Sequence, residues 1–132
     1  MEFIELDSPN VLAVKKSKQF KVNELEILLK EAHNKVRHFG TIDIYEELNA
    51  KDESDSFPWF EHFNYLWQVG LSNIEKVAII ADEKSLSKIK SSHNNFFSRI
   101  NIKFYSFDEK KQALHFLKKN LFLNTYYFTN IS

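Results

Sequence analysis

The chain has 132 residues, 43% of them hydrophobic, and its 18 basic residues balance its 18 acidic residues, so the net charge is zero. This length suits one domain with a sizeable core, whereas an electroneutral chain lacks the excess of Lys and Arg on which generic nucleic-acid binding depends. Because the chain has no cysteine, disulfides and thiolate metal sites are excluded.

The N-terminal segment predicts a hairpin at the edge of a sheet. Residues Phe3 to Leu6 and Val11 to Lys15 have the composition of strands. Ser8-Pro9-Asn10 favours a turn between them, since Pro presets φ and Asn tolerates the left-handed region. The segment lacks the basic start and apolar core of a signal peptide, so we expect a soluble, cytoplasmic protein.

A helix and a third strand are predicted next. Asn23 and Glu26 have the spacing of a capping box, and Gly40 is a typical helix end. Between them an apolar stripe recurs at helical spacing: Leu25, Leu28, Leu29, Ala32, Val36 and Phe39. Residues 41–48 then alternate with the period of a strand, although their acidic content is unusual for a central strand.

A polar, acidic loop over residues 49–56 leads into an aromatic helix that is predicted to end at Gly70. Pro58 suits the first turn of a helix, where its missing N–H costs nothing. The aromatic and apolar side chains of this helix are Trp59, Phe60, Phe63, Tyr65, Leu66 and Trp67. They occupy more than one side of the helix, so core packing accounts for only one stripe of them.

The second half of the chain continues the alternation of strands and helices. Lys76 to Ala81 contains the longest apolar run, Val77 to Ala81, which is far shorter than the roughly 20 residues of a membrane span. Asp82 can cap a helix with Leu86, Ile89, His93, Phe96 and Phe97 on one side. A last strand is predicted to contain Ile102, Phe104 and Phe107. A final helix follows, for which Ser106 and Asp108 are candidate caps. The inward side of this helix is predicted to carry Ala113, Leu114 and Leu117.

This element order predicts an α/β domain with a mixed, mainly parallel five-stranded sheet and about four helices. We assign residues 1–120 to the domain and residues 121–132 to an apolar C-terminal extension. Residues 121–131 (LFLNTYYFTNI) are rich in aromatic and β-branched residues and carry no charge, and so much apolar surface should not be left in water. The extension is interpreted as an added edge strand, a lid, or a contact with a second copy, which would make a homodimer.

The element order and several segments resemble the SpoIIAA-like, or STAS-like, domains, particularly their small stand-alone bacterial members. The resemblance is best from Phe57 to Leu117. It includes the aromatic helix, the strand Glu75-Lys76-Val77-Ala78-Ile79-Ile80-Ala81-Asp82, and the closing pattern Phe104…Phe107-Asp108-Glu109…Ala113-Leu114…Leu117. These residues are core and cap residues rather than catalytic motifs, so the resemblance implies a fold more strongly than a function.

The resemblance implies a non-enzymatic module that binds a protein partner or a small, often apolar, ligand. Some relatives are phosphorylated on a Ser within an Asp-Ser-Ser-Gly-like motif, which this chain lacks. Its corresponding loop, residues 52–58, carries Ser54 and Ser56 without a Gly. A phospho-regulated switch that uses Ser54 or Ser56 is therefore an alternative hypothesis.

Catalytic and metal sites have weaker support in the sequence. Glu46, Glu47 and Asp82 fall at the carboxyl edge of the predicted sheet, where ligands of open α/β sheets bind, so acid–base catalysis is a third hypothesis. The five histidines, His33, His38, His62, His93 and His115, form no recognised ligand motif. The chain has no nucleophile elbow, and its two isolated glycines cannot form the usual glycine-rich phosphate-binding loop. We therefore expect that the protein is not an enzyme and binds no metal or other cofactor.

The aromatic residues beyond one helical stripe are the candidate binding site. We expect a ligand or partner to lie between the aromatic helix and the next helix, in contact with Trp59, Phe63, Trp67, Phe96 and Phe97. Burial of each exposed ring would contribute roughly 1.5–3 kcal/mol to such binding.

Overall fold

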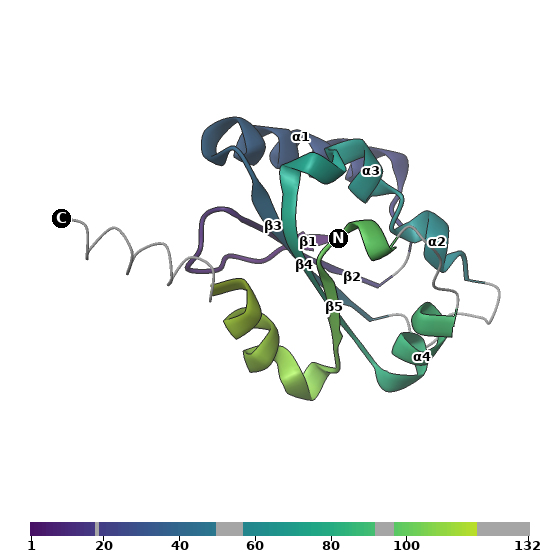
Figure 1. Cartoon of the computed structure of the whole chain (residues 1–132). Coiled ribbons are helices and arrows are strands. Elements are labelled where there is room, and N and C mark those ends of the chain that lie inside the picture. The colour runs from purple at the N-terminus through teal and green to yellow at the C-terminus, as the bar shows by residue number, and fades with distance from the viewer. Residues whose placement is uncertain (18, 50–56, 92–96, 119–132) are drawn as a thin grey trace, which may run out of the picture.

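The structure, a computed structural model, describes residues 1–17, 19–49, 57–91 and 97–118 (Figure 1). These residues form a five-stranded sheet whose strands lie in chain order, with β1 antiparallel to β2 and the other pairs parallel. The strands are β1 (Glu2–Phe3), β2 (Val11–Lys16), β3 (Ile42–Leu48), β4 (Ile74–Ala81) and β5 (Ile102–Tyr105). The predicted α/β class with a mixed, mainly parallel sheet is confirmed.

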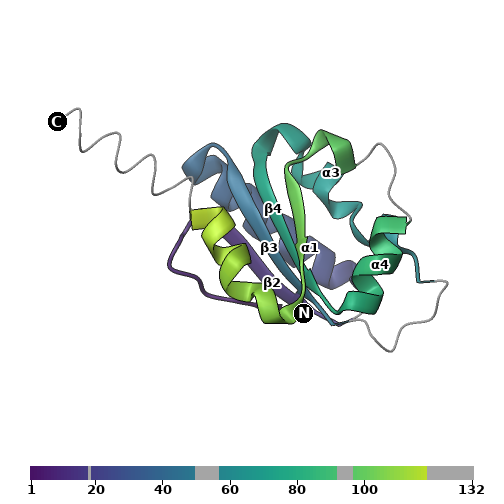
Figure 2. The ribbon, with the colours of Figure 1, turned by 60° about the horizontal axis from the view of Figure 1, so that its bottom comes forward.

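The helices that connect the parallel strands lie on one face of the sheet, and a final helix lies on the other (Figures 1 and 2). The connecting helices are α1 (Val22–Phe39), α2 (Trp59–His62), α3 (Tyr65–Val69) and α4 (Glu83–Ser91), and the final helix comprises residues 110–118. Because each parallel strand is added on the same side of the previous one, right-handed crossovers place all connecting helices on one face. No helix within the described ranges has both the length and the hydropathy that a membrane crossing requires.

Side chains alternate along each strand between two apolar cores. The larger core lies under α1–α4 and contains the fully buried Ile44 of β3 and Ile79 of β4. The smaller core lies under the final helix and consists of Val11, Ala13, Tyr45, Ala78, Ile80, Ala113 and Leu117. Ala113 and Leu117 are therefore buried, as predicted for the inward side of this helix.

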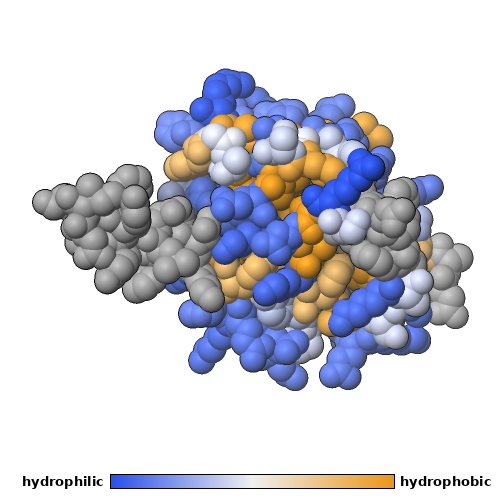
Figure 3. Space-filling view, viewed as in Figure 1, coloured by the Kyte–Doolittle hydropathy of each residue, from blue (hydrophilic) through white to orange (hydrophobic). Residues whose placement is uncertain are grey.

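In the view of Figure 1, apolar residues on the surface lie over the edge of the sheet formed by β5. β5 pairs with β4 through residues 102–105. Figure 3 shows apolar residues gathered over this edge, between the layer of connecting helices and the final helix. Ile102 and Phe104 pack partly against the larger core, so the core reaches the surface along this strand.

Several predicted helix ends are confirmed. Gly40 ends α1 with a φ of 84°, in the left-handed region that favours glycine. Asp82 caps α4, since its Oδ1 accepts a hydrogen bond of 2.9 Å from the backbone N–H of Ser85. Ser106 rather than Asp108 begins the last helical segment, because its backbone N–H donates to Glu109 Oε1 at 2.8 Å.

Three predicted boundaries were wrong for local reasons. The first strand ends at Phe3 instead of Leu6, because the chain then turns away from β2. The α1 cap uses Lys21 N–H and Glu24 Oε1, at 3.1 Å, instead of Asn23 and Glu26. Phe107 begins the short 3-10 helix η3 (Phe107–Glu109) and does not extend β5, because the Ser106 cap starts a helical turn there.

The predicted aromatic helix is two short helices. α2 ends at His62 and α3 begins at Tyr65. Across the junction Asn64 N–H donates to the carbonyl oxygen of Glu61, and Leu66 N–H donates to that of Phe63. These bonds span three residues and tighten the turn, so the backbone changes direction between His62 and Tyr65.

The central strand β3 is buried along its whole length, including its three acids, Asp43, Glu46 and Glu47. A parallel strand with neighbours on both sides and layers on both faces is usually apolar. Asp43, at the amino end, accepts a hydrogen bond of 3.0 Å from Lys76 N–H on β4. Burial, and then the nearby charge of Glu75, raise the pKa of Asp43 from 3.8 to about 6.

We predict that Asp43→Asn removes a pH-dependent loss of stability. Between pH 3.8 and about 6 the folded state holds the Asp43 proton more tightly than the unfolded state. Its contribution to the free energy of unfolding is therefore fully present below pH 3.8 and is lost as the pH rises through about 6. Relative to the parent, the variant should gain at most about 3 kcal/mol between pH 4 and pH 7, measured by urea unfolding at both values. If the free energies of unfolding of the variant and the parent differed by the same amount at pH 4 and at pH 7, the raised pKa of Asp43 would be contradicted.

Candidate functional site

The three acids predicted at the carboxyl edge of the sheet lie in separate environments. Glu46 and Glu47 are consecutive on β3, so their side chains point to opposite faces of the sheet. Asp82 is engaged by Ser85, whose Oγ donates to Asp82 Oδ2 at 2.9 Å. Burial alone would raise the pKa of Asp82, but the hydrogen bonds from Ser85 outweigh it and lower the pKa. The carboxylates needed for the acid–base hypothesis do not converge on one cleft.

Glu47 belongs to the face of the sheet that the final helix covers. Its Oε2 accepts a hydrogen bond of 2.7 Å from the hydroxyl of Tyr45, and its Oε1 lies 3.2 Å from Lys110 Nζ on the final helix. Burial and the bond to Glu47 raise the pKa of the Tyr45 phenol. This acid therefore joins β3 to the final helix.

Glu46 lies at the centre of a fully buried polar network on the opposite face. Its Oε2 is 2.8 Å from His62 Nε2, and its Oε1 accepts a hydrogen bond of 2.8 Å from the Tyr65 hydroxyl. Since a carboxylate only accepts, this contact assigns the His62 hydrogen to Nε2. Burial and then the charge of Glu46 raise the pKa of the Tyr65 phenol, so this phenol stays protonated as a donor.

The turn between α2 and α3 makes this network possible. His62 is the last residue of α2, and Tyr65 is the first residue of α3. The change of backbone direction between them brings both side chains onto one carboxylate of the strand below.

Aromatic rings enclose the imidazole of His62. Phe20 stacks on it with a centroid distance of 5.2 Å and an interplanar angle of 12°. Phe63 meets it edge-on at 4.9 Å, and Phe57 lies 5.9 Å away. Phe20 also meets Tyr65 edge-on at 5.2 Å. The imidazole is thus fixed by a carboxylate at one nitrogen and by rings around it.

A pocket of about 360 Å³ opens beside this network. Phe20 and Leu25 supply its apolar surface, whereas its remaining walls are polar. The lining residues are Gln19, Phe20, Leu25, Glu61, His62, Asn64, Tyr65 and Gln68. The carboxyl ends of β2 and β3 meet here, which is the usual position of ligands in open α/β sheets.

The second nitrogen of His62 has no partner. His62 is buried, yet its Nδ1 makes no hydrogen bond with any group that the structure describes. A buried polar atom without a partner costs on the order of 1–3 kcal/mol. His62 also lines the pocket, but its side chain is fully buried, so Nδ1 is an unpartnered polar atom behind the pocket wall.

Lys16 holds the other side of Phe20. The Nζ atom of this buried lysine lies 5.0 Å from the ring centroid of Phe20 and 2.8 Å from Glu24 Oε1. The bonds from Lys16, from Lys21 N–H and from the N-terminal ammonium group lower the pKa of Glu24 to about 2. The positive charge of Lys16 is therefore already paired, and its part here is to position the phenyl ring.

This arrangement is a hydrogen-bonded network beside a pocket. The network contains one carboxylate, one imidazole and one phenol that stays protonated. Within the described residues no three His, Cys, Asp or Glu side chains are grouped so that they could hold a metal ion. What the site offers is an aromatic wall and one unpartnered nitrogen.

The five aromatic residues proposed from the sequence have different positions. Trp59 and Phe63 are buried in the larger core. Trp67 is 42% exposed on α3, with the guanidinium of Arg99 5.8 Å from its ring. Phe96 and the side chain of Phe97 lie outside the described residues, so a binding role for these five residues together stays a prediction.

The other sequence-based candidates fall on segments that the structure does not describe. Ser54 and Ser56 lie within residues 50–56, and the extension of residues 121–132 follows the last described residue. Phosphorylation of the loop and dimerisation through the extension stay predictions.

Sequence reasoning missed the network itself. His62 and Tyr65 were assigned to a single helix, and Glu46 was grouped with Glu47 and Asp82. One signal was present: Glu46 interrupts an otherwise apolar series at every second residue of its strand, with Ile44 before it and Leu48 after it. An acid on the buried side of a strand needs partners, although the sequence does not say which.

Comparison with known proteins identifies one family. A family model described as SpoIIAA-like matches residues 11–118. No curated protein and no solved structure gave a match.

We predict that Glu46→Ala strongly destabilises the fold. It leaves the buried donors of His62 and Tyr65 without their acceptor, which should lower the free energy of unfolding by about 3–5 kcal/mol. Tyr65→Phe removes one donor only and should cost about 1–2 kcal/mol.

Urea unfolding checks both values. Glu61→Ala, an exposed acid on α2, is the control and should change stability by less than about 0.5 kcal/mol. A Glu46→Ala variant no less stable than this control would show that the network does not stabilise the fold.

Proposed function

The chain belongs to the SpoIIAA-like family, and from this premise we propose that it is a non-enzymatic binding module whose ligand occupies the pocket beside His62. Domains of this family are generally regulatory or interaction modules. The pocket beside Glu46, His62 and Tyr65 is where the described part of this chain offers both shape and chemistry for such binding.

The unpartnered Nδ1 of His62 is the observation that carries the proposal. Glu46 occupies Nε2 at 2.8 Å and thereby fixes the ring orientation. In the neutral imidazole the hydrogen is on Nε2, so Nδ1 has a lone pair and accepts a hydrogen bond. A ligand with an O–H or N–H donor would satisfy this buried atom.

The walls of the pocket define the rest of the ligand. Phe20 presents the edge of its ring, since Lys16 and His62 lie against its two faces. Gln19, Asn64 and Gln68 provide neutral polar groups at the rim. A volume of about 360 Å³ is at the lower end of the range for small-molecule sites. The ligand that fits is small, carries a hydrogen-bond donor, and combines an apolar part beside Phe20 and Leu25 with polar groups for the other walls.

The same geometry argues for binding rather than turnover. General acid–base catalysis needs groups placed on either side of a reacting atom, and the neighbouring acids are engaged elsewhere. Glu47 lies on the other face of the sheet with Tyr45 and Lys110, and Asp82 caps α4.

Phenol and anisole test this proposal, because both carry the same ring but only phenol has a donor. In nitrogen-edited NMR titrations of the full chain, we expect phenol to shift the amides of Phe20, His62 and Tyr65. Anisole should bind at least about fivefold more weakly, since it leaves Nδ1 unsatisfied.

Two matched variants keep the test specific. Phe20→Ala should abolish the phenol shifts, whereas Phe39→Ala should leave them unchanged, because Phe39 is 43% exposed at the far end of α1. Equal binding of phenol and anisole, or shifts that survive Phe20→Ala, would refute the proposed site.

A further inference from the structure

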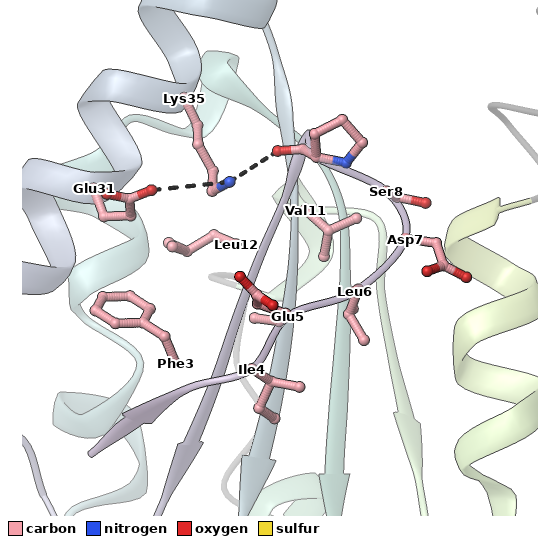
Figure 4. Close-up of a pocket in the computed structure, with 12 residues that line it drawn as sticks. Phe3, Ile4, Glu5, Leu6, Asp7, Ser8, Val11, Leu12, Glu31 and Lys35 are labelled. Carbon is pink, nitrogen blue, oxygen red and sulfur yellow. Dashed lines mark hydrogen bonds and ion pairs between the residues drawn. The ribbon is translucent and has the colours of Figure 1, made fainter.

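A second, larger hollow lies at the β1 edge of the sheet, away from the pocket beside His62. It encloses about 740 Å³ between the segment of residues 4–8, β2 and α1 (Figure 4). Leu12 lies toward its interior, and Phe3, which is 46% exposed, lies at one end. Lys35 closes the other end, since its Nζ donates to the carbonyl oxygen of Pro9 at 2.8 Å. We call this hollow the edge groove.

The edge groove exists because β1 is too short to cover β2. β1 pairs with β2 only at Lys15 and Val14. Ile4 N–H still donates to the carbonyl oxygen of Ala13, at 2.9 Å, and the chain then leaves β2 until Ser8 accepts a bond from Val11 N–H. The stretch of β2 from Val11 to Ala13 is therefore a sheet edge bordered by a hollow, where an unpaired strand edge is a template for another chain.

The final helix delivers the C-terminus of the described chain to this place. Lys118 Nζ lies 3.8 Å from Asp7 Oδ2, and Figure 4 shows Asp7 on the side of the segment that faces the final helix. A smaller pocket of about 140 Å³ separates Leu6 and Val11 from Leu114 and Leu117. It shares the segment of residues 5–8 with the edge groove, so the two hollows flank the same piece of backbone.

The sequence after Lys118 is rich in apolar side chains, which suit the apolar part of the lining of these hollows. Seven of the residues 121–131 are large and apolar, and none is charged. Their β-branched and aromatic side chains suit an extended segment beside a sheet edge. Fourteen residues follow Lys118, and an extended chain of that length reaches about 45 Å, which is ample to enter the edge groove.

We propose that residues 121–131 of the same chain bind along the edge groove. In this proposal Leu121 to Leu123 are assigned to the smaller pocket beside Leu117, and Tyr126 to Phe128 are assigned to the exposed ring of Phe3. The segment thereby shields the edge of β2 from other chains. This inference does not depend on the proposed function, because the edge groove and the pocket beside His62 share no residue.

Disulfide trapping tests this proposal in the full chain, because the absence of cysteine gives a clean background. One double variant carries Glu31→Cys and Tyr127→Cys. Glu31 is half-buried on α1 and lines the edge groove. A control variant carries Arg99→Cys and Tyr127→Cys. Arg99 is exposed in the 3-10 helix η2 (Phe97–Arg99) near β5. Under mild oxidation the Glu31→Cys and Tyr127→Cys variant should form an intramolecular disulfide at least about tenfold faster than the Arg99→Cys and Tyr127→Cys control. The reason is that a disulfide needs Cα atoms within about 7 Å of each other.

Each outcome of the trapping decides the question. A monomeric, bridged Glu31→Cys and Tyr127→Cys variant supports the proposal. Equal rates for the two double variants, or a bridge that joins two copies, overturns it, and the bridged dimer would assign the edge groove to a second copy instead.

Hydrogen exchange supplies an independent measurement. The triple substitution Tyr126→Ser, Tyr127→Ser and Phe128→Ser should speed exchange of the Ala13 amide, which faces the open edge of β2, relative to Ile79, which lies in the centre of β4. Protection that stays the same would overturn the proposal. Phenol binding at the pocket beside His62 should persist in this variant, so failure of one proposal is distinguishable from failure of the other.

Discussion

Burial of the acids of β3 is the constraint on which the arrangement of this domain depends. A central strand has neighbours on both sides and layers on both faces, so each of its polar side chains must find a partner within the protein. Glu46 obtains His62 and Tyr65 from the α2–α3 junction, and Glu47 obtains Tyr45 and Lys110. The two consecutive acids therefore connect the strand to opposite layers.

The strand order has a consequence for the two faces of the sheet. Because the connecting helices all lie on one face, the other face depends on the final helix and on the N-terminal segment. That helix must cross the sheet from β5 toward β2, where Lys118 meets Asp7. The last described residue, Lys118, therefore lies beside the edge of the sheet that is incompletely paired.

The two proposals assign different tasks to different parts of the molecule. The pocket beside His62 uses a rigid imidazole and a clamped phenyl ring, so its specificity rests on one nitrogen and one aromatic surface. The edge groove offers apolar area and an open strand edge to a segment of the same chain. Binding at the first would occur on the side of the sheet that carries α1–α3, and the second would protect the sheet from unwanted pairing.

Sequence patterns alone predict the order of strands and helices, the α/β class, and the family resemblance that the SpoIIAA-like match confirms. Local rules sufficed for these, since a Gly that ends α1, an Asp that caps α4 and a run such as Val77 to Ala81 act over a few residues. The contact of Glu46 with His62 and Tyr65 could be found only in three dimensions, because it depends on a break between two short helices and on how these helices pack on β3. The structure likewise separates Glu46 from Glu47, which face different helix layers. Packing, rather than composition, fixes which helices cover each face of the strand.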